Sequence, residues 1–359
     1  MGYAGLSIAA LLAKKMNLSI AIPTYNRSKE LNSLLKNLSN QINECVQHKN
    51  KIEIVISDNC SNDNTKEVVK KFIELNPKLN ISYYIHNKNY GLDVNIHRSI
   101  ESSVGKYVWI IGDDDRLKDH AVLNVFNALN IAKDYSFCFV NYDINVNGKI
   151  LLNNNIKNET FPIKGEEMFM KTGFSSSFIS SNIFNKAAWK KQNFEKYFNT
   201  NWYHFFASRD IVIDTDTLII GQPQITQTGL DIFHSRSEKK NENDKEGLEF
   251  YISAHIKFLS FVFSLSNYGY PKHVIKTAKK IGKKDNLRQI IYYKLTRDTY
   301  SFDQILLIIN KMREFFGLNI IFWFIHVPLL LLPKFIIKGI YEAFLPTYHI
   351  LKKYYLNFR

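Results

Sequence analysis

The sequence predicts an α/β fold with a mostly parallel central sheet, followed by a mainly helical C-terminal region. Three observations support this. Short apolar runs alternate with amphipathic runs of helical period from residue 18 to residue 140, and this alternation is typical of strand–helix–strand units. The apolar runs lead into clusters of Asp, Asn, Ser and Thr, which favour turns and helix starts. Beyond residue 236, apolar residues recur mainly at helical spacing.

Each predicted element follows from its local pattern. Residues 18–22 form an apolar run that Pro23 is expected to end, and Ser28 is placed to cap the helix that follows. The predicted strands are residues 18–22, 52–57, 81–84, 108–111, 136–140 and 178–184. The predicted helices are residues 28–41, 66–75, 93–103 and 119–132. Residues 145–158, rich in Asn, Lys and Gly, predict an insert or a hairpin.

The run at residues 108–111 leads, after one glycine, into three consecutive carboxylates: Asp113, Asp114 and Asp115. Ligands of open α/β sheets bind outside the carboxyl ends of such buried strands. Adjacent carboxylates repel one another, and hard cations such as Mg²⁺ and Mn²⁺ prefer oxygen ligands of this kind. The pattern therefore favours a metal that holds a diphosphate, while a solvated acidic turn is the alternative for three Asp taken alone.

Composition narrows the classes of function. The chain has 359 residues, of which 45% are hydrophobic and 22% charged, enough for one large or two smaller domains. Its net charge of +14 suits an anionic partner, although a general excess of Lys is the alternative explanation. No motif specifies nucleic acid. Three widely spaced cysteines indicate neither a disulfide framework nor a zinc site and suit a reducing cytoplasm. The oligomeric state is not indicated.

The predicted domain organisation has three parts. Residues 1–15 form a short apolar appendage, which lacks the preceding strand that dinucleotide binding requires and is too short to cross a bilayer. Residues 16–236 form the α/β domain. Residues 237–359 form the helical region, and the charged, Asn-rich stretch 237–246 marks the boundary.

Four motifs occur in a fixed order at characteristic intervals. They are Ile22-Pro23-Thr24-Tyr25-Asn26-Arg27, the turn at residues 57–65, Asn87-Lys88-Asn89-Tyr90-Gly91, and Gly105-Lys106-Tyr107 leading into residues 112–115. Together they resemble the family-2 glycosyltransferases of the GT-A fold. The resemblance is close from residue 18 to residue 117 and weaker beyond. The ordered set is far more specific than any one motif.

The resemblance implies a donor site. Thr24, Tyr25 and Asn26 would line the nucleotide base, and Asp58 would accept a hydrogen bond from it, which suits the imide N–H of uracil. Among the three acids, Asp113 would face the ribose.

The resemblance also implies that Asp114 ligates the metal, with Asp115 at the rim as a further ligand. The chain departs from the family at Gly112, where the first acid of the family motif is usual. It departs again at Ile96-His97, where the family has an Arg-Asn pair; Arg98 is the candidate for the phosphates instead.

The acceptor side departs further, because the usual Glu-Asp pair is absent. His204 is the residue there best suited to take a proton near neutral pH, and Asp210 is the competing base. The alternative for His204 is packing among aromatic residues. Later in the chain, His234 occupies a plausible place for a metal ligand and Arg236 for a phosphate partner. An ordinary surface histidine is the alternative for His234.

The most apolar run, residues 318–333, is interrupted by Pro328 and is too short to span a bilayer. It favours an interfacial, membrane-associating segment at residues 318–338, with a buried core helix as the alternative. The flanking basic residues are Lys311, Arg313, Lys334, Lys338, Lys352 and Lys353.

The sequence as a whole predicts a glycosyltransferase that depends on Mn²⁺ or Mg²⁺ and inverts the anomeric centre. It would move a sugar from a nucleotide-sugar donor, with a UDP-sugar favoured, to a glycan acceptor that is lipid-linked, in surface polysaccharide biosynthesis. Its expected location is the cytoplasm, peripheral at an anionic membrane surface on the inner face. The alternatives are a nucleotidyltransferase, which would need a glycine- and Lys/Arg-rich phosphate loop after the first strand, and a non-catalytic glycan- or membrane-binding protein.

Overall fold

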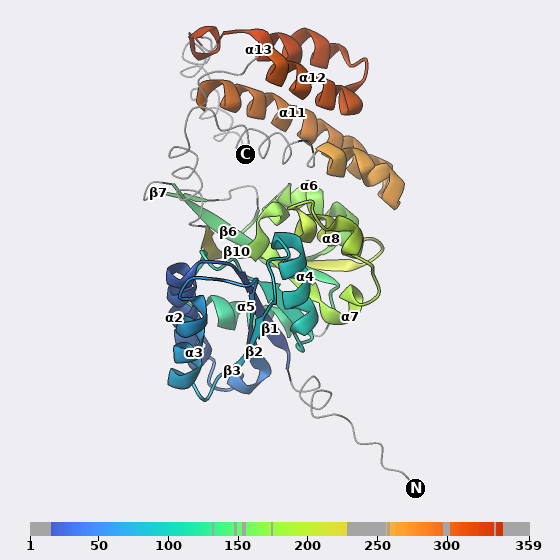
Figure 1. Ribbon diagram of the computed structural model, residues 1–359. Helices are drawn as coiled ribbons and strands as arrows, with labels where there is room; N and C mark the ends of the chain where they lie inside the picture. The colour runs from blue at the N-terminus through green and yellow to red at the C-terminus, as the bar shows by residue number, and fades with distance from the viewer. Residues whose placement is uncertain are drawn as a thin grey trace. The chain divides into compact units, whose positions relative to one another are not determined.

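One mixed sheet organises the first half of the chain in the computed structural model (Figure 1). The structure describes residues 16–130, 133–146, 149–152, 156–173, 175–227, 256, 259–296, 302–333 and 335–339. The chain divides into two compact units, residues 1–244 with 268–274 and residues 245–267 with 275–359. The predicted boundary at residue 236 falls outside the described residues and stays a prediction.

The first unit contains all of the described strands. They are β1 (Leu18–Thr24), β2 (Ile52–Asp58), β3 (Asn80–Ile85), β4 (Tyr107–Ile110), β5 (Arg116–Leu117), β6 (Phe137–Val146), β7 (Lys149–Leu152), β8 (Thr160–Lys164), β9 (Asn182–Asn185) and β10 (Asp216–Gln227). Its helices are α2 (Ser28–Glu44), α3 (Thr65–Leu75), α4 (Leu92–Ser102), α5 (Ala121–Leu129), α6 (Met168–Thr172), α7 (Lys186–Trp189) and α8 (Tyr203–Ile211).

The sheet has the order β3-β2-β1-β4-β9-β6-β10-β5. The first four strands are mutually parallel, and β6 is parallel to β10, whereas β9 lies antiparallel between β4 and β6. The prediction of a mostly parallel α/β sheet is therefore confirmed. The predicted hairpin after residue 145 is also present, because β7 pairs antiparallel with β6.

Helices cover both faces of this sheet. Helices α2, α3 and α5 pack together on one side, and α4 and α8 lie on the other (Figure 1). Strands β1, β2 and β4 are buried along their whole length. Burial on both faces explains why these strands are continuous apolar runs rather than alternating ones.

Strand β1 continues through Pro23, where the sequence predicted its end. The carbonyl of Ala21 accepts from Ile111 N on the β4 side, and that of Thr24 accepts from Asn59 N on the β2 side. Alternation along the strand turns Pro23 toward β4. The pairing with β4 stops at Ala21, so the missing N–H of the proline removes no ladder bond.

The predicted strand at residues 178–184 is mostly turn. Two 3₁₀ turns, Ser175–Ser177 and Ile179–Ser181, precede β9. The amide Nδ2 of Asn182 donates to the carbonyls of Phe178 at 2.7 Å, Ile179 at 3.0 Å and Ser176 at 3.0 Å. Such side-chain bonds to the backbone offer a local alternative to strand pairing, which the apolar pattern did not reveal.

The predicted cap of the first helix is also different. Ser28 is the first helical residue, and its backbone N donates to Asp63 Oδ2 at 3.0 Å. Burial opposes ionisation of Asp63, but hydrogen bonds from Thr65 and Ser28 outweigh it and lower the pKa of this carboxyl. A carboxylate at a helix N-terminus is favourable, and here it comes from the turn after β2.

The second unit contains α11 (Lys272–Thr296), of which the first turn belongs to the first unit, then α12 (Phe302–Phe316), a π-helical turn (Phe322–His326) and α13 (Val327–Leu331). The predicted helical character is confirmed. Asn286 on α11 bonds His326 at 2.8 Å, which ties the π-helical turn to α11. No helix in the described part of the chain is long and apolar enough to cross a membrane.

Gly105 shows why the glycine before β4 is needed. A Cβ at this position would lie 2.5 Å from Ser19 Oγ and 2.7 Å from Ser19 N. We expect Gly105→Ala to lower the free energy of unfolding by about 1–3 kcal/mol through overpacking, measured by urea denaturation. Gly339, which has open space around its Cβ position, is the control. Equal stabilities of the two alanine variants would contradict this account.

Candidate active site

The candidate site lies where β1, β2 and β4 reach their carboxyl ends. Thr24 at the end of β1 is the register partner of Asp58 at the end of β2. Thr24 Oγ1 also donates to Asp113 Oδ2 at 2.7 Å, across 89 residues of sequence. One threonine thus touches the acid loop after β4 and is paired with the acid that ends β2. The carboxyl-edge location expected for the three aspartates is where they are found.

Arg27 compensates the charge of the acid loop. Its Nη1 lies 2.9 Å from Asp113 Oδ1 and 2.5 Å from Asp114 Oδ2. The side chain of Asp113 is 7% exposed and that of Asp114 is 19% exposed, so Asp114 is the more accessible of the two. The two carboxylates thus hold a cationic group between them, which offsets part of their charge.

Burial raises the pKa of Asp113 to about 6, and the neighbouring charge of Asp114 adds to the effect. The Arg27 charge and the hydrogen bonds from Thr24 and Arg27 oppose this rise without cancelling it. Keeping the Asp113 carboxyl ionised in its buried position therefore lowers the stability of the folded state. Ionisable groups whose pKa is strongly shifted are concentrated at functional sites.

Asp115 does not lie at the rim, contrary to the expectation. It is buried, and its Oδ2 accepts from Ser180 Oγ. Ser180 Oγ in turn accepts from Gly112 N at 2.8 Å. Asp115 thus fastens the acid loop to the turn before β9, and its predicted role as a metal ligand stays a prediction.

Gly112 occupies the family's first acid position for a steric reason. A Cβ here would lie 2.8 Å from Asp115 Oδ2 and 3.3 Å from Asp114 Oδ1. With Asp115 turned inward, the loop has no room for another side chain at this position. The inward position of Asp115 therefore explains the glycine at position 112, where the family motif usually has an acid.

The loop after β1 is joined to the loop after β2. Asn26 has a φ of +52°, a left-handed conformation that Asn tolerates better than most residues. Its Oδ1 accepts from Asn62 N at 2.8 Å, and its N donates to Ser61 Oγ at 2.9 Å. Tyr25 is 41% exposed. The predicted role of Thr24, Tyr25 and Asn26 in lining the nucleotide base stays a prediction.

Asp58 is buried at the base of this loop pair. Its Oδ1 accepts from Ser61 N at 2.8 Å, and its Oδ2 accepts from Tyr83 OH at 2.7 Å. Burial and the Asp58 hydrogen bond raise the pKa of the Tyr83 hydroxyl, so the tyrosine remains the donor. Each carboxylate oxygen has two lone pairs. Asp58 is therefore held in one orientation and keeps acceptor capacity.

Arg98 lies apart from the Arg27 ion pairs. Its guanidinium stacks 3.9 Å from the centroid of the Tyr90 ring, and its Nη1 is 3.1 Å from His86 Nδ1. Burial lowers the pKa of His86, and the charge of Arg98 lowers it further, so this contact favours a neutral imidazole that accepts. The predicted phosphate role of Arg98 stays a prediction.

The two candidate bases are buried in α8. His204 Nε2 donates to Ser177 O at 2.7 Å, which leaves Nδ1 as the acceptor, and Nδ1 is buried without a partner. Burial lowers the pKa of His204 to about 4 against the opposing effect of the Ser177 bond. Asp210 accepts from Tyr197 OH at 2.5 Å and pairs with Arg209 Nε at 3.0 Å. Both side chains are bound to protein groups, so we assign no general base.

Sequence reasoning missed a second carboxylate in the region predicted to face the acceptor. Asp93 at the start of α4 is buried. Its Oδ2 accepts from Asn201 N at 2.8 Å and its Oδ1 from Tyr203 N at 3.3 Å, so it caps the start of α8. The stretch where the family carries its Glu-Asp pair thus receives a carboxylate from a helix more than 100 residues earlier. No local pattern signals such a pairing.

The residues of the acid loop fit a divalent cation in chemistry. Asp114 supplies one accessible carboxylate, and diphosphate oxygens supply ligands of the same hard class. Among the described residues, no group of three or more His, Cys, Asp or Glu side chains is arranged to hold a metal alone. His234 and Arg236, the predicted late metal and phosphate partners, lie outside the described residues.

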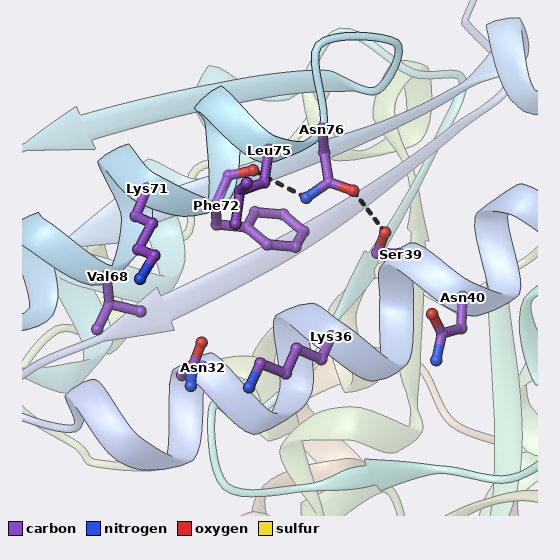
Figure 2. Close-up of a pocket in the computed structure, with 9 residues that line it drawn as sticks. All are labelled: Asn32, Lys36, Ser39, Asn40, Val68, Lys71, Phe72, Leu75 and Asn76. Atoms are coloured by element: carbon purple, nitrogen blue, oxygen red, sulfur yellow. Dashed lines mark hydrogen bonds between the residues drawn. The ribbon is translucent and has the colours of Figure 1, made fainter.

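A hollow lies between α2 and α3, and its volume is about 510 Å³ (Figure 2). Ser39 Oγ and Asn76 Oδ1 are bonded across it at 2.7 Å, and Lys36 and Lys71 lie along it. Its lining contains no carboxylate. It therefore has no ligand for a metal diphosphate and is not the candidate site.

The carboxyl edge of the parallel strands thus carries an aspartate pair bridged by an arginine, beside a loop with an exposed tyrosine. The chain belongs to glycosyl transferase family 2, whose family model matches residues 19–206. Family 2 is the family that the four motifs predicted.

Two relatives illustrate the similarity. Abequosyltransferase RfbV of Salmonella typhimurium is 29% identical over 211 residues, which cover 53% of this chain and 60% of that protein. The GalNAc(5)-diNAcBac-PP-undecaprenol beta-1,3-glucosyltransferase of Campylobacter jejuni is 27% identical over 210 residues, which cover 55% and 62%. The chain therefore matches about three fifths of each relative's length.

Solved structures confirm the GT-A fold. S. aureus TarS 1-349 matches 84% of this chain and 80% of its own with a TM-score of 0.60 at 16% identity. Its complex with UDP-GlcNAc matches 84% and 81% with a TM-score of 0.59, also at 16% identity. The mannosyltransferase PcManGT from Pyrobaculum calidifontis, in complex with GDP-Man and Mn²⁺, matches 91% and 87% with a TM-score of 0.50 at 12% identity.

The raised pKa of Asp113 predicts a pH dependence of stability. The folded state binds this proton more tightly than the unfolded state, whose carboxyl has a pKa of 3.8. The contribution of Asp113 therefore makes stability fall as pH rises from about 4 to about 6, by roughly 3 kcal/mol. We expect Asp113→Asn to remove this fall, measured by urea denaturation at pH 4 and pH 7.

Asp134→Asn is the matched control, because Asp134 is 70% exposed and paired with a surface lysine. It should keep the pH dependence of the unsubstituted protein. If the Asp113→Asn variant also kept this pH dependence, the pKa of Asp113 would not be raised by burial.

Proposed function

We propose that this chain transfers one sugar from a nucleotide-sugar donor to a hydroxyl of a glycan acceptor, with inversion at the anomeric carbon and with Mn²⁺ or Mg²⁺. The observation that carries the proposal is the pair Asp113 and Asp114 at the carboxyl edge, bridged by Arg27 in a chain of family 2. The proposed membrane location is the inner face, peripheral, because the acceptor class proposed below is lipid-linked.

UDP is the proposed nucleotide. Asp58 is fixed by Ser61 and Tyr83 and keeps lone pairs for the imide N–H of uracil. Tyr25 offers an exposed ring on which a base can stack. The TarS structures were obtained with UDP and with UDP-GlcNAc, which supports this choice of nucleotide for a chain with the same fold.

Asp114 is the proposed metal ligand, and a divalent cation bound there would stabilise the nucleotide diphosphate as it leaves. The PcManGT complex contains Mn²⁺, which supports the same class of cofactor here. Arg27 stands between the two carboxylates and can turn its guanidinium to phosphate oxygens, which match its geometry. Asp113 and Thr24 are proposed to hold the ribose beside them.

A lipid-linked glycan is the proposed acceptor. The Campylobacter relative is named for an undecaprenol diphosphate-linked glycan. The non-catalytic alternative rests on the burial of His204 and Asp210, which leaves no assigned base. The nucleotidyltransferase alternative has no comparable support, because residues 23–27 contain no glycine and one basic residue, Arg27. Release of free sugar from UDP-sugars with Mn²⁺, abolished by EDTA, separates the enzyme from the non-catalytic alternative.

Asp114→Ala is expected to lower metal-dependent transfer at least about a hundredfold, since one anionic partner of the cation is lost. Folding should be little affected, because this side chain is partly exposed. Asp119→Ala, which removes an exposed carboxylate five residues later, is the control. Calorimetric titration of Mn²⁺ with UDP measures the binding. Unchanged metal-dependent affinity in the Asp114 variant would exclude it as the ligand.

Asp58→Asn is expected to weaken UDP binding several-fold more than CDP binding, because N3 of cytosine carries no proton for the carboxylate to accept. Competition among UDP, CDP, GDP and dTDP measures the preference; dTDP shares the imide and should follow UDP. Tyr83→Phe keeps the carboxylate and should keep the preference for uracil. A native protein that prefers CDP or GDP would refute the role given to Asp58.

A further inference from the structure

The second unit exposes an unusual number of apolar side chains. Of the 17 large hydrophobic side chains exposed in the described part of the chain, ten lie between residues 302 and 335. The other seven are scattered through the first unit, as single exposed apolar residues normally are. A concentration of this kind marks an interaction surface rather than ordinary composition.

The exposed residues of the π-helical turn and its neighbours form what we call the apolar stripe. Its members are Ile320, Ile321, Phe324, Ile325, Leu331 and Phe335. Ile320 is 72% exposed, Phe324 77% and Phe335 74%. The first four recur at helical spacing, so they project from one side of the same segment.

The opposite side of this segment is anchored, which prevents the stripe from turning inward. Phe322 is buried and stacks on Phe316 with ring centroids 5.1 Å apart. His326 is also buried and bonds Asn286 on α11. The segment is thus apolar on both sides, and only one side serves the core of the second unit. The alternative that residues 318–333 form a buried core helix accounts only for the buried side of this segment.

Charge identifies the partner. Residues 245–267 and 275–359 contain 17 Lys and Arg against seven Asp and Glu, a net charge of +10, whereas the whole chain has +14. Lys276 and Lys280 on α11 and Lys311 and Arg313 on α12 are exposed. A second copy of so basic a unit would be repelled, and a nucleic acid offers no apolar surface to cover isoleucine and phenylalanine. An anionic lipid surface offers acyl chains for the exposed apolar side chains and negative headgroups for the cations.

We propose that the apolar stripe docks this chain on an anionic membrane, with the stripe in the headgroup and acyl boundary and the cations at the headgroups. The described helical run that carries the first four residues of the stripe ends at Leu331, and α13 has only five residues, which suits a position in the interface. This inference does not depend on the proposed reaction, because binding requires neither donor nor acceptor.

The test is flotation of the full-length protein with vesicles of phosphatidylcholine alone and with added phosphatidylglycerol. We expect binding to the anionic vesicles that weakens as salt is raised. The double substitution Ile320→Ser and Phe324→Ser should weaken it at least about tenfold, because each removes a buried apolar contact with lipid. Val46→Ser with Leu75→Ser, at equally exposed positions of the first unit, should leave it unchanged.

A second pair tests the charges. Lys311→Gln with Arg313→Gln should lower binding to anionic vesicles about fivefold per charge and leave binding to neutral vesicles unchanged. Lys36→Gln with Lys71→Gln, in the hollow between α2 and α3 (Figure 2), is the matched control. Circular dichroism checks that all variants are folded.

Two outcomes would overturn the proposal. The first is a full-length protein that stays off anionic vesicles at low salt. The second is light scattering that shows a dimer without vesicles which the Ile320 and Phe324 substitutions convert to a monomer, since the stripe would then join two copies of the chain. A full-length protein that floats with anionic vesicles but shows no transferase activity would count against the proposed function alone.

Discussion

The donor side of this protein depends on how three adjacent aspartates are accommodated on one short turn. Asp113 is compensated by Arg27 and Thr24, and Asp115 is turned inward to Ser180. These contacts join the loops after β1 and β4 to the turn before β9, so the loops at the carboxyl edge are held by charge and hydrogen bonds rather than by apolar packing. The raised pKa of Asp113 shows that the compensation is incomplete. The cation proposed to bind at Asp114 would offset part of the remaining negative charge.

The first strands and helices were predictable because their information is local. A buried strand is an apolar run, and a surface helix repeats every 3.6 residues. The location of the acid loop followed from one topological rule, that ligands bind at the carboxyl ends of parallel strands. Helix α8 was not predicted, since all of its residues are buried and its sequence shows no polar face to reveal the helical period.

The site was predictable in its position but not in its contacts. The roles inferred for Asp115 and His204 came from motif order, whereas their burial depends on partners 65 and 27 residues away. Arg27 stood in a recognised motif, yet nothing in the sequence indicated that it would face Asp113 and Asp114. Pairings of this kind arise only when the fold brings distant loops together. The positions of the loops could therefore be predicted from the sequence, whereas the side chains that pair across them could be seen only in the structure.

Asp93 gives the fold a mechanical property. The carboxylate lies two residues beyond Gly91, in the first turn of α4, and it holds the backbone N–H groups of Asn201 and Tyr203 at the start of α8. The first turn of α4, which directly follows loop 87–91, and the start of α8 are therefore linked through one carboxylate. Because this carboxylate is buried, a shift of α4 that broke these two hydrogen bonds would cost free energy. A displacement of α4 is thus expected to carry the start of α8 with it.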